Sequence, residues 1–175
     1  MLRYWNKLVN TDCKVALFHG KAVYPIFKNG STSLFNEARD VLVNHQIKNY
    51  VGDIQIYIRD PEQRFVSGVN EYSRQNNLPV MVAYQQILNG DLIDRHFAPQ
   101  WIWLFHLFKY HRGNVTLRPF SEIGQVCRLT KNRSSVKVQM QVPEEYVSID
   151  EQLIGHIGQT LPLEQLVRSY KHVLS

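Results

Sequence analysis

The alternation of hydrophobic and polar residues near the start of the chain predicts a strand, a loop and a helix in that order. Residues 21–28 form a β-rich apolar run bounded by turn residues, which predicts a buried strand. Residues 31–46 place Leu34, Ala38 and Val41 at helical spacing after a serine that can cap a helix. A helix over 31–46 is therefore expected, joined to the strand by a short polar loop.

The same order of elements recurs immediately afterwards. Residues 53–60 alternate isoleucine with polar residues, a pattern that predicts a second strand. Residues 61–77 open with Pro61, which suits the first position of a helix, and carry apolar residues along one face. Two successive strand–loop–helix units favour a sheet of parallel strands covered by helices.

The second half of the chain is patterned less clearly. A further helix is expected over 78–90, and the C-terminal residues 161–175 have the periodicity of a last helix. The aromatic-rich stretch 101–120 is expected to hold one or two strands around the turn His-Arg-Gly-Asn. We predict a single α/β domain over 1–175, with a short parallel sheet flanked by helices in three layers.

The loop after the first predicted strand, Lys-Asn-Gly-Ser-Thr-Ser, has residues suited to holding an anion. Gly30 lets the main chain approach a phosphate closely, Lys28 adds a full charge, and the hydroxyls of 31–33 add donors. A capped helix preceded by a chance lysine is the simpler interpretation of this stretch taken alone. An ATP- or GTP-binding loop is excluded, because here the lysine precedes the glycine.

The loop after the second predicted strand is also basic. Arg59 ends the strand, Asp60 and Pro61 turn the chain, and Arg64 and Ser67 follow one turn apart on the helix. An arginine and a serine placed in this way can bind one phosphate with a fork and a hydroxyl. The alternative is that the two arginines are solvated surface residues.

Together these stretches resemble the PAPS-dependent sulfotransferases, especially the carbohydrate and Golgi-type branch. That family moves a sulfuryl group from 3′-phosphoadenosine 5′-phosphosulfate (PAPS) to a hydroxyl or amine, releases PAP, and needs no metal. The resemblance implies a P-loop-like sulfotransferase fold in three layers. It also implies that the 5′-phosphosulfate is bound by Lys28, Asn29, Gly30, Ser31, Thr32 and Ser33, and the 3′-phosphate by Arg59, Arg64 and Ser67.

Two later segments extend the resemblance. Asp-Arg-His-Phe-Ala-Pro-Gln at 94–100 is similar to the His-Trp-x-Pro-Gln segment of the family, with Phe97 in place of the tryptophan. Lys-Asn-Arg-Ser-Ser-Val-Lys at 131–137 is similar to its late basic loop. In that context Arg133 and Ser134 are expected near the 3′-phosphate, as part of a flap over the nucleotide.

Sulfuryl transfer is an in-line displacement that depends on positioning and charge stabilisation. We expect Lys28 to neutralise the negative charge that grows on the departing 5′-phosphate. His96 is the best candidate for the general base, because histidine titrates near neutral pH. Asp94 could orient His96 or act in its place, and packing beneath the site is the alternative role for His96. His106 and His111 lie in an aromatic run and are expected to be structural.

Composition narrows the class of partner. The chain has 175 residues, 44% of them hydrophobic, and a net charge of +5, which suits an anionic partner. A small-molecule or glycan acceptor is expected, with neither nucleic acid nor membrane as a partner. No secretory signal or spanning segment is evident, so a cytoplasmic location is expected.

The alternative function is a non-catalytic nucleotide- or polyanion-binding module. A nucleic-acid-binding protein is third, since no RNA-recognition or helix-turn-helix signature supports it.

Overall fold

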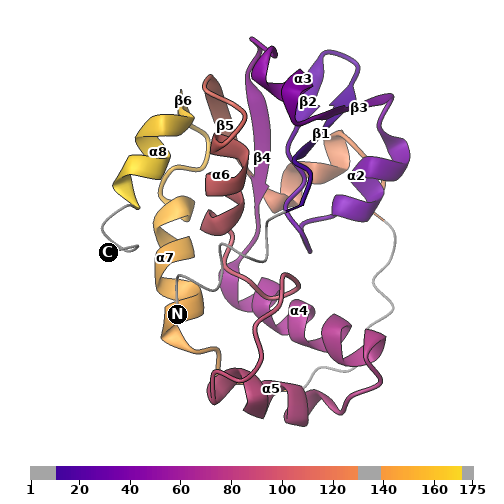
Figure 1. Ribbon diagram of the computed structural model, residues 1–175, viewed down its shortest axis with the longest axis vertical. Coiled ribbons are helices and arrows are strands. Elements are labelled where there is room, and N and C mark those ends of the chain that lie inside the picture. Colours follow the sequence, from indigo (N-terminus) through magenta and orange to yellow (C-terminus); the bar gives the residue numbers. More distant parts are fainter. Residues whose placement is uncertain (1–10, 130–138, 171–175) are drawn as a thin grey trace.

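A computed structural model describes residues 11–129 and 139–170. The strands are β1 (Lys14–Phe18), β2 (Lys21–Val23), β3 (Asp40–Val43), β4 (Ile54–Ile58), β5 (Asn114–Pro119) and β6 (Thr160–Pro162). The helices are α2 (Ser31–Glu37), α3 (His45–Lys48), α4 (Pro61–Gln75), α5 (Val80–Leu88), α6 (Trp101–Phe108), α7 (Glu144–Ile154) and α8 (Leu163–Ser169), with the 3₁₀ helix η1 (Phe120–Gln125) after β5. Figure 1 shows how these elements are arranged around a central sheet.

The six strands form one mixed sheet in the order β3-β1-β2-β4-β5-β6. Only its centre is parallel: β4 pairs in parallel with β2 on one side and with β5 on the other. The outer pairs, β1 with β2, β1 with β3 and β5 with β6, are antiparallel. The α/β class is confirmed, whereas the expectation of a parallel sheet is wrong for the outer strands.

Both faces of the sheet are covered by apolar packing. In β4, Ile54 and Ile56 belong to the large hydrophobic core, while Tyr57 points to the opposite face, as the twofold repeat of a strand requires. There Tyr57 packs with Leu34 of α2 and Ile123 of η1 in a smaller cluster. Figure 1 shows α2 on one side of the sheet and α6 and α8 on the other.

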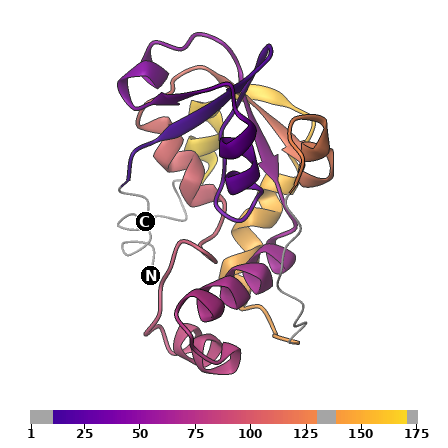
Figure 2. The same ribbon diagram turned by 90° about the vertical axis from the view of Figure 1, so that its right-hand side faces the viewer.

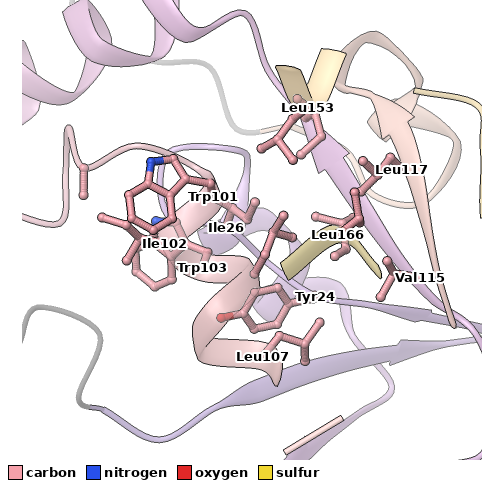
Figure 3. Close-up of a cluster of buried hydrophobic side chains, with 14 of the residues drawn as sticks. Tyr24, Ile26, Trp101, Ile102, Trp103, Leu107, Val115, Leu117, Leu153 and Leu166 are labelled. Atoms are coloured by element: carbon pink, nitrogen blue, oxygen red, sulfur yellow. The ribbon is translucent and has the colours of Figure 1, made fainter. Parts of the chain in front are cut away.

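The large core is built around α6, which occupies the first half of the stretch 101–120; the expected strand of this stretch is confirmed after the turn, as β5. Six of the eight residues of α6 are buried, among them Trp101 and Trp103. Figure 3 shows these side chains beside Tyr24, Ile26 and residues of β5, α7 and α8. An apolar run that is buried nearly all round has neither a helical nor a strand period, so its pattern could not identify a helix.

The helix expected over 31–46 is shorter than predicted, and a strand takes the place of its second half. α2 covers only Ser31–Glu37, and Asp40–Val43 form the edge strand β3. Val41 and Val43 pair with Ala16 and Lys14 of β1, a partner that lies far away in the sequence. β-branched residues favour such a pairing over continuation of the helix.

The predicted strand over 21–28 is shorter than expected, because β2 ends at Val23. The predictions of a strand over 53–60 and of helices over 61–77 and 78–90 are confirmed by β4, α4 and α5. α8 confirms a C-terminal helix, but it starts at Leu163, because residues 161 and 162 belong to β6. Figure 2 shows α4 and α5 together at the end of the molecule opposite β1 and β2. Among the described residues, no helix is both long and apolar enough to cross a membrane.

Candidate functional site

The two predicted anion-binding loops meet at one cavity of about 370 Å³, which we call the main cavity. It lies where the β2–α2 loop, the end of β4, helix α4 and the segment before α6 come together. Its lining residues are Phe27, Lys28, Gly30, Ser31, Thr32, Ser33, Arg59, Glu71, Gln75, His96, Phe120 and Leu129. The structure therefore brings Lys28, Arg59 and His96, predicted from three separate segments, to one place.

The β2–α2 loop turns sharply at its lysine and its glycine. Lys28 has φ 67° and Gly30 has φ 74°, so both lie in the left-handed region that favours glycine. A side chain at position 30 would also meet Ile123 at 2.9 Å and Leu129 at 3.0 Å. Gly30 is thus favoured by its backbone conformation, whereas the two nearby side chains meet it only with their flexible ends.

The two loops are in direct contact. The Nη1 atom of Arg59 donates a hydrogen bond to the main-chain carbonyl of Lys28 at 3.3 Å. The guanidinium also lies over the ring of Phe120, 5.4 Å from its centroid. Burial lowers the pKa of Arg59, partly offset by the neighbouring charge of Asp60. The hydrogen bond to Lys28 uses one of the five guanidinium N–H groups, so Arg59 can still donate to a ligand.

The charge of the main cavity is positive. Burial lowers the pKa of Lys28, the carboxylate of Glu71 raises it, and the charges of Arg59 and Arg64 lower it further. Glu71 is held by Arg74, whose Nη2 lies 2.6 Å from Glu71 Oε1. This hydrogen bond is the largest cause that lowers the pKa of Glu71 to about 2. Because Arg74 offsets the charge of Glu71, Lys28 and Arg59 are left to attract an anion.

Gln100 connects the two loops from below. Its Oε1 accepts hydrogen bonds from Asn29 Nδ2 at 2.6 Å and from the main-chain N–H of Arg59 at 3.0 Å. Its Nε2 donates to the Arg59 carbonyl at 2.8 Å. Asn29 Nδ2 also donates to the Tyr57 carbonyl at 2.8 Å and is buried, so Asn29 positions the loop rather than lining the cavity.

Gln100 is itself held by a buried carboxylate. Asp150 of α7 accepts from the main-chain N–H of Gln100 at 2.6 Å and from that of Trp101 at 3.0 Å, at the start of α6. Burial raises the pKa of Asp150 to about 6, although these hydrogen bonds and the charge of Arg64 lower it. No motif in the sequence pointed to Asp150, which lies 50 residues beyond the segment that it positions.

Arg64 and Ser67 are placed differently from Arg59. Arg64 is buried, and its guanidinium donates to the main-chain carbonyls of Phe27 and Ala98. Burial lowers its pKa to about 10, so it remains charged at neutral pH. The Ser67 hydroxyl is buried without a hydrogen-bond partner among the described residues. Neither side chain lines the main cavity.

His96 and Asp94 form a hydrogen-bonded pair. The His96 Nδ1 lies 2.5 Å from Asp94 Oδ1, which also accepts from the His96 main-chain N–H at 2.8 Å. Burial raises the pKa of Asp94, but these hydrogen bonds and the charges of His96 and Arg95 outweigh it and hold that pKa below its usual value. Because the carboxylate fixes the proton on Nδ1, Nε2 is the ring atom that can accept a proton.

Helix α4 supports this histidine through a glycine. A side chain at Gly68 would lie 2.1 Å from the carbonyl oxygen of His96, so the main chain at 96 and 97 rests directly on the helix. A glycine in the middle of a predicted helix is the signal that could have revealed this contact.

Two of the expected donor-binding residues, Arg133 and Ser134, lie outside the described residues. Within 11–129 and 139–170, no three His, Cys, Asp or Glu side chains are grouped so that they could hold a metal ion. No protein-family model, curated protein or solved structure matches this chain.

Proposed function

We propose that the chain is a PAPS-dependent sulfotransferase with a sulfotransferase-type, P-loop-like fold, and that the main cavity binds the donor. The observation that carries the proposal is the meeting of both predicted anion loops at one cavity, with Arg59 bonded to the Lys28 carbonyl. A nucleotide with phosphate groups at both its 5′ and 3′ positions is the kind of ligand that needs two such loops. The 5′-phosphosulfate lies at residues 28–33 and the 3′-phosphate at Arg59.

The three predicted 3′-phosphate residues have different parts in this proposal. Arg59 lines the main cavity and contacts the 3′-phosphate. Arg64 holds the two loops together through the main-chain carbonyls of Phe27 and Ala98. The Ser67 hydroxyl is buried outside the main cavity, so it does not contact the nucleotide.

In the proposed reaction the acceptor oxygen attacks the sulfur of PAPS while the bond from sulfur to the 5′-phosphate oxygen breaks. The acceptor hydroxyl loses its proton to Nε2 of His96, and the electron pair of the broken bond leaves on PAP. Lys28 stabilises the charge that develops on this leaving phosphate. Asp94 orients His96 and stabilises its protonated form.

Incubation with sulfur-labelled PAPS and a mixed pool of hydroxyl and amine acceptors tests this function. A sulfotransferase releases PAP and transfers the label to an acceptor, and Lys28→Ala slows the transfer by about 10²–10³. Binding of PAP without transfer to any acceptor would instead support the non-catalytic nucleotide-binding module. Preferential binding of an oligonucleotide over PAP would contradict the donor site.

A further inference from the structure

Lys28 has a strained backbone conformation at the centre of the proposed donor site. Its φ of 67° lies in the left-handed region, which a residue other than glycine keeps only where the surrounding structure holds it there. The contacts that hold residues 27–29 therefore decide how the β2–α2 loop presents its charge and its N–H groups to a 5′-phosphate.

The strained part of the loop is held by two arginines that follow β4. The Phe27 carbonyl accepts hydrogen bonds from Arg64 Nε at 3.2 Å and Arg64 Nη2 at 3.0 Å. The carbonyl of Lys28 itself accepts from Arg59 Nη1 at 3.3 Å. Because Arg59 is the proposed contact of the 3′-phosphate, the loop that binds the 5′ end is held from the side of the 3′-phosphate.

Gln100 adds a buried link between the two loops. Its Oε1 accepts from Asn29 Nδ2 at 2.6 Å and from the Arg59 main-chain N–H at 3.0 Å, so a single oxygen atom joins them. Its Nε2 donates to the Arg59 carbonyl at 2.8 Å, and the residue is fully shielded from solvent. A shift of the Arg59 main chain is therefore passed to Asn29, the residue that follows Lys28.

We propose that the two phosphate sites of the main cavity are energetically coupled and that Gln100 is the positioning residue that couples them. A 3′-phosphate bound at Arg59 fixes this residue and, through Gln100, the strained loop at Lys28, so that the 5′-phosphate binds more tightly. Coupling between two sites is reciprocal, so the 5′-phosphate strengthens binding of the 3′-phosphate by the same factor. The inference rests on the proposed function, because it takes both phosphates from one nucleotide.

Calorimetry with four ligands that differ only in their phosphates measures this coupling without an acceptor. The ligands are adenosine, AMP, adenosine 3′-phosphate and PAP, with weak binding measured by displacement of PAP. If the two sites are independent, a 3′-phosphate improves the affinity of adenosine and of AMP by the same factor. In the wild type the improvement should be larger for AMP by about fivefold or more, as is usual for coupled sites.

Two variants break the link at its two ends. Gln100→Met keeps the length of the side chain but can bond neither to Asn29 nor to the Arg59 main chain, so the two factors should become equal. Asn29→Ala removes the end of the link in the β2–α2 loop and should give the same result, which also tests the inference if Gln100→Met does not fold. Thr116→Val is the matched control, because it removes the hydrogen bond of a buried side chain to Thr160, 2.7 Å away, outside the main cavity. It should keep the wild-type coupling.

Equal factors in the wild type, or wild-type coupling in either folded link variant, would overturn the inference and leave the donor site standing. Loss of the coupling in Thr116→Val as well would show that the loss of any buried hydrogen bond has this effect, and would remove the particular role of Gln100. Failure of the wild type to bind PAP would instead remove the proposed function.

Discussion

The β2–α2 loop and the β4–α4 loop each join a strand to a helix and carry basic residues, but their side chains are placed differently. In the first loop Lys28, Gly30 and the hydroxyl residues that follow all line the main cavity. In the second loop only Arg59 does so, while Arg64 is buried against main-chain carbonyls. The spacing of a motif thus locates a loop, but burial decides which of its side chains a ligand can contact.

The largest effect is expected at the residue that neither loop supplies. Replacement of His96 with alanine removes the proposed base and should lower the transfer rate by about 10²–10⁴. Affinity for PAP should change little, because His96 acts on the acceptor. Steady-state transfer and calorimetry with PAP, measured in parallel, check this expectation. Near-normal turnover in His96→Ala would assign the base to another group, with Asp94 as the first candidate.

The second-largest effect is expected on replacement of Lys28 in the first loop. It acts on charge that develops only as PAP departs, so Lys28→Ala is expected to lower kcat by about 10²–10³ and to weaken PAP binding by much less. Lys48→Ala, at an exposed lysine of α3 outside the main cavity, serves as the control and should leave both quantities unchanged. A loss confined to PAP affinity would show that Lys28 binds the donor without stabilising the transition state.

Asp150 holds Gln100, which joins the two loops, and should make the stability of the folded protein depend on pH. Its pKa in the folded protein, about 6, is above its usual value of 3.8, because burial disfavours the charged form. The contribution of Asp150 to the free energy of unfolding therefore falls as pH rises from about 4 to above 6, by up to about 3 kcal/mol. Urea unfolding of wild type and Asp150→Asn across this range should show a difference that shrinks with rising pH. Parallel curves would contradict this role for Asp150.

A smaller effect is expected from Gly68→Ala. Alanine normally stabilises a helix by about 1 kcal/mol relative to glycine, but here its Cβ would collide with the His96 carbonyl. We expect a net destabilisation of about 1–3 kcal/mol and slower transfer, because the His96 main chain must move. Gly124→Ala, where a Cβ meets nothing within 4 Å, is the matched control for thermal unfolding. Equal behaviour of the two variants would remove the proposed support of His96.

The sequence predicted the elements whose signals are local. β4 and α4 were predicted because alternation and a proline at the helix start depend only on neighbouring residues. β3 was missed because its pairing partner, β1, is distant in the sequence, and the short apolar run at 40–43 fits either a helix or a strand. α6 was missed because its residues are buried on nearly every side, which removes the helical period.

The candidate site was predictable to a similar extent. The motifs identified the cavity-lining Lys28, Arg59 and His96, because their residue types and spacing carry the chemistry. They did not show that Gln100 joins the loops or that Asp150 holds Gln100, since these contacts depend on how α6 and α7 pack. They also gave no sign that Arg64 would be buried, because the pattern of a helix face does not identify what covers it.

The most direct test of the two-loop donor site compares the binding of PAP and AMP, which lacks the 3′-phosphate, to wild type and Arg59→Ala by calorimetry. Arg59→Ala should weaken PAP binding about tenfold or more, the loss of a charge-assisted contact of about 1.5–3 kcal/mol, and leave AMP binding nearly unchanged. Lys28→Ala should affect both nucleotides alike. If wild type binds PAP no better than AMP, or if Arg59→Ala weakens both equally, the 3′-phosphate does not lie at Arg59 and the central claim is wrong.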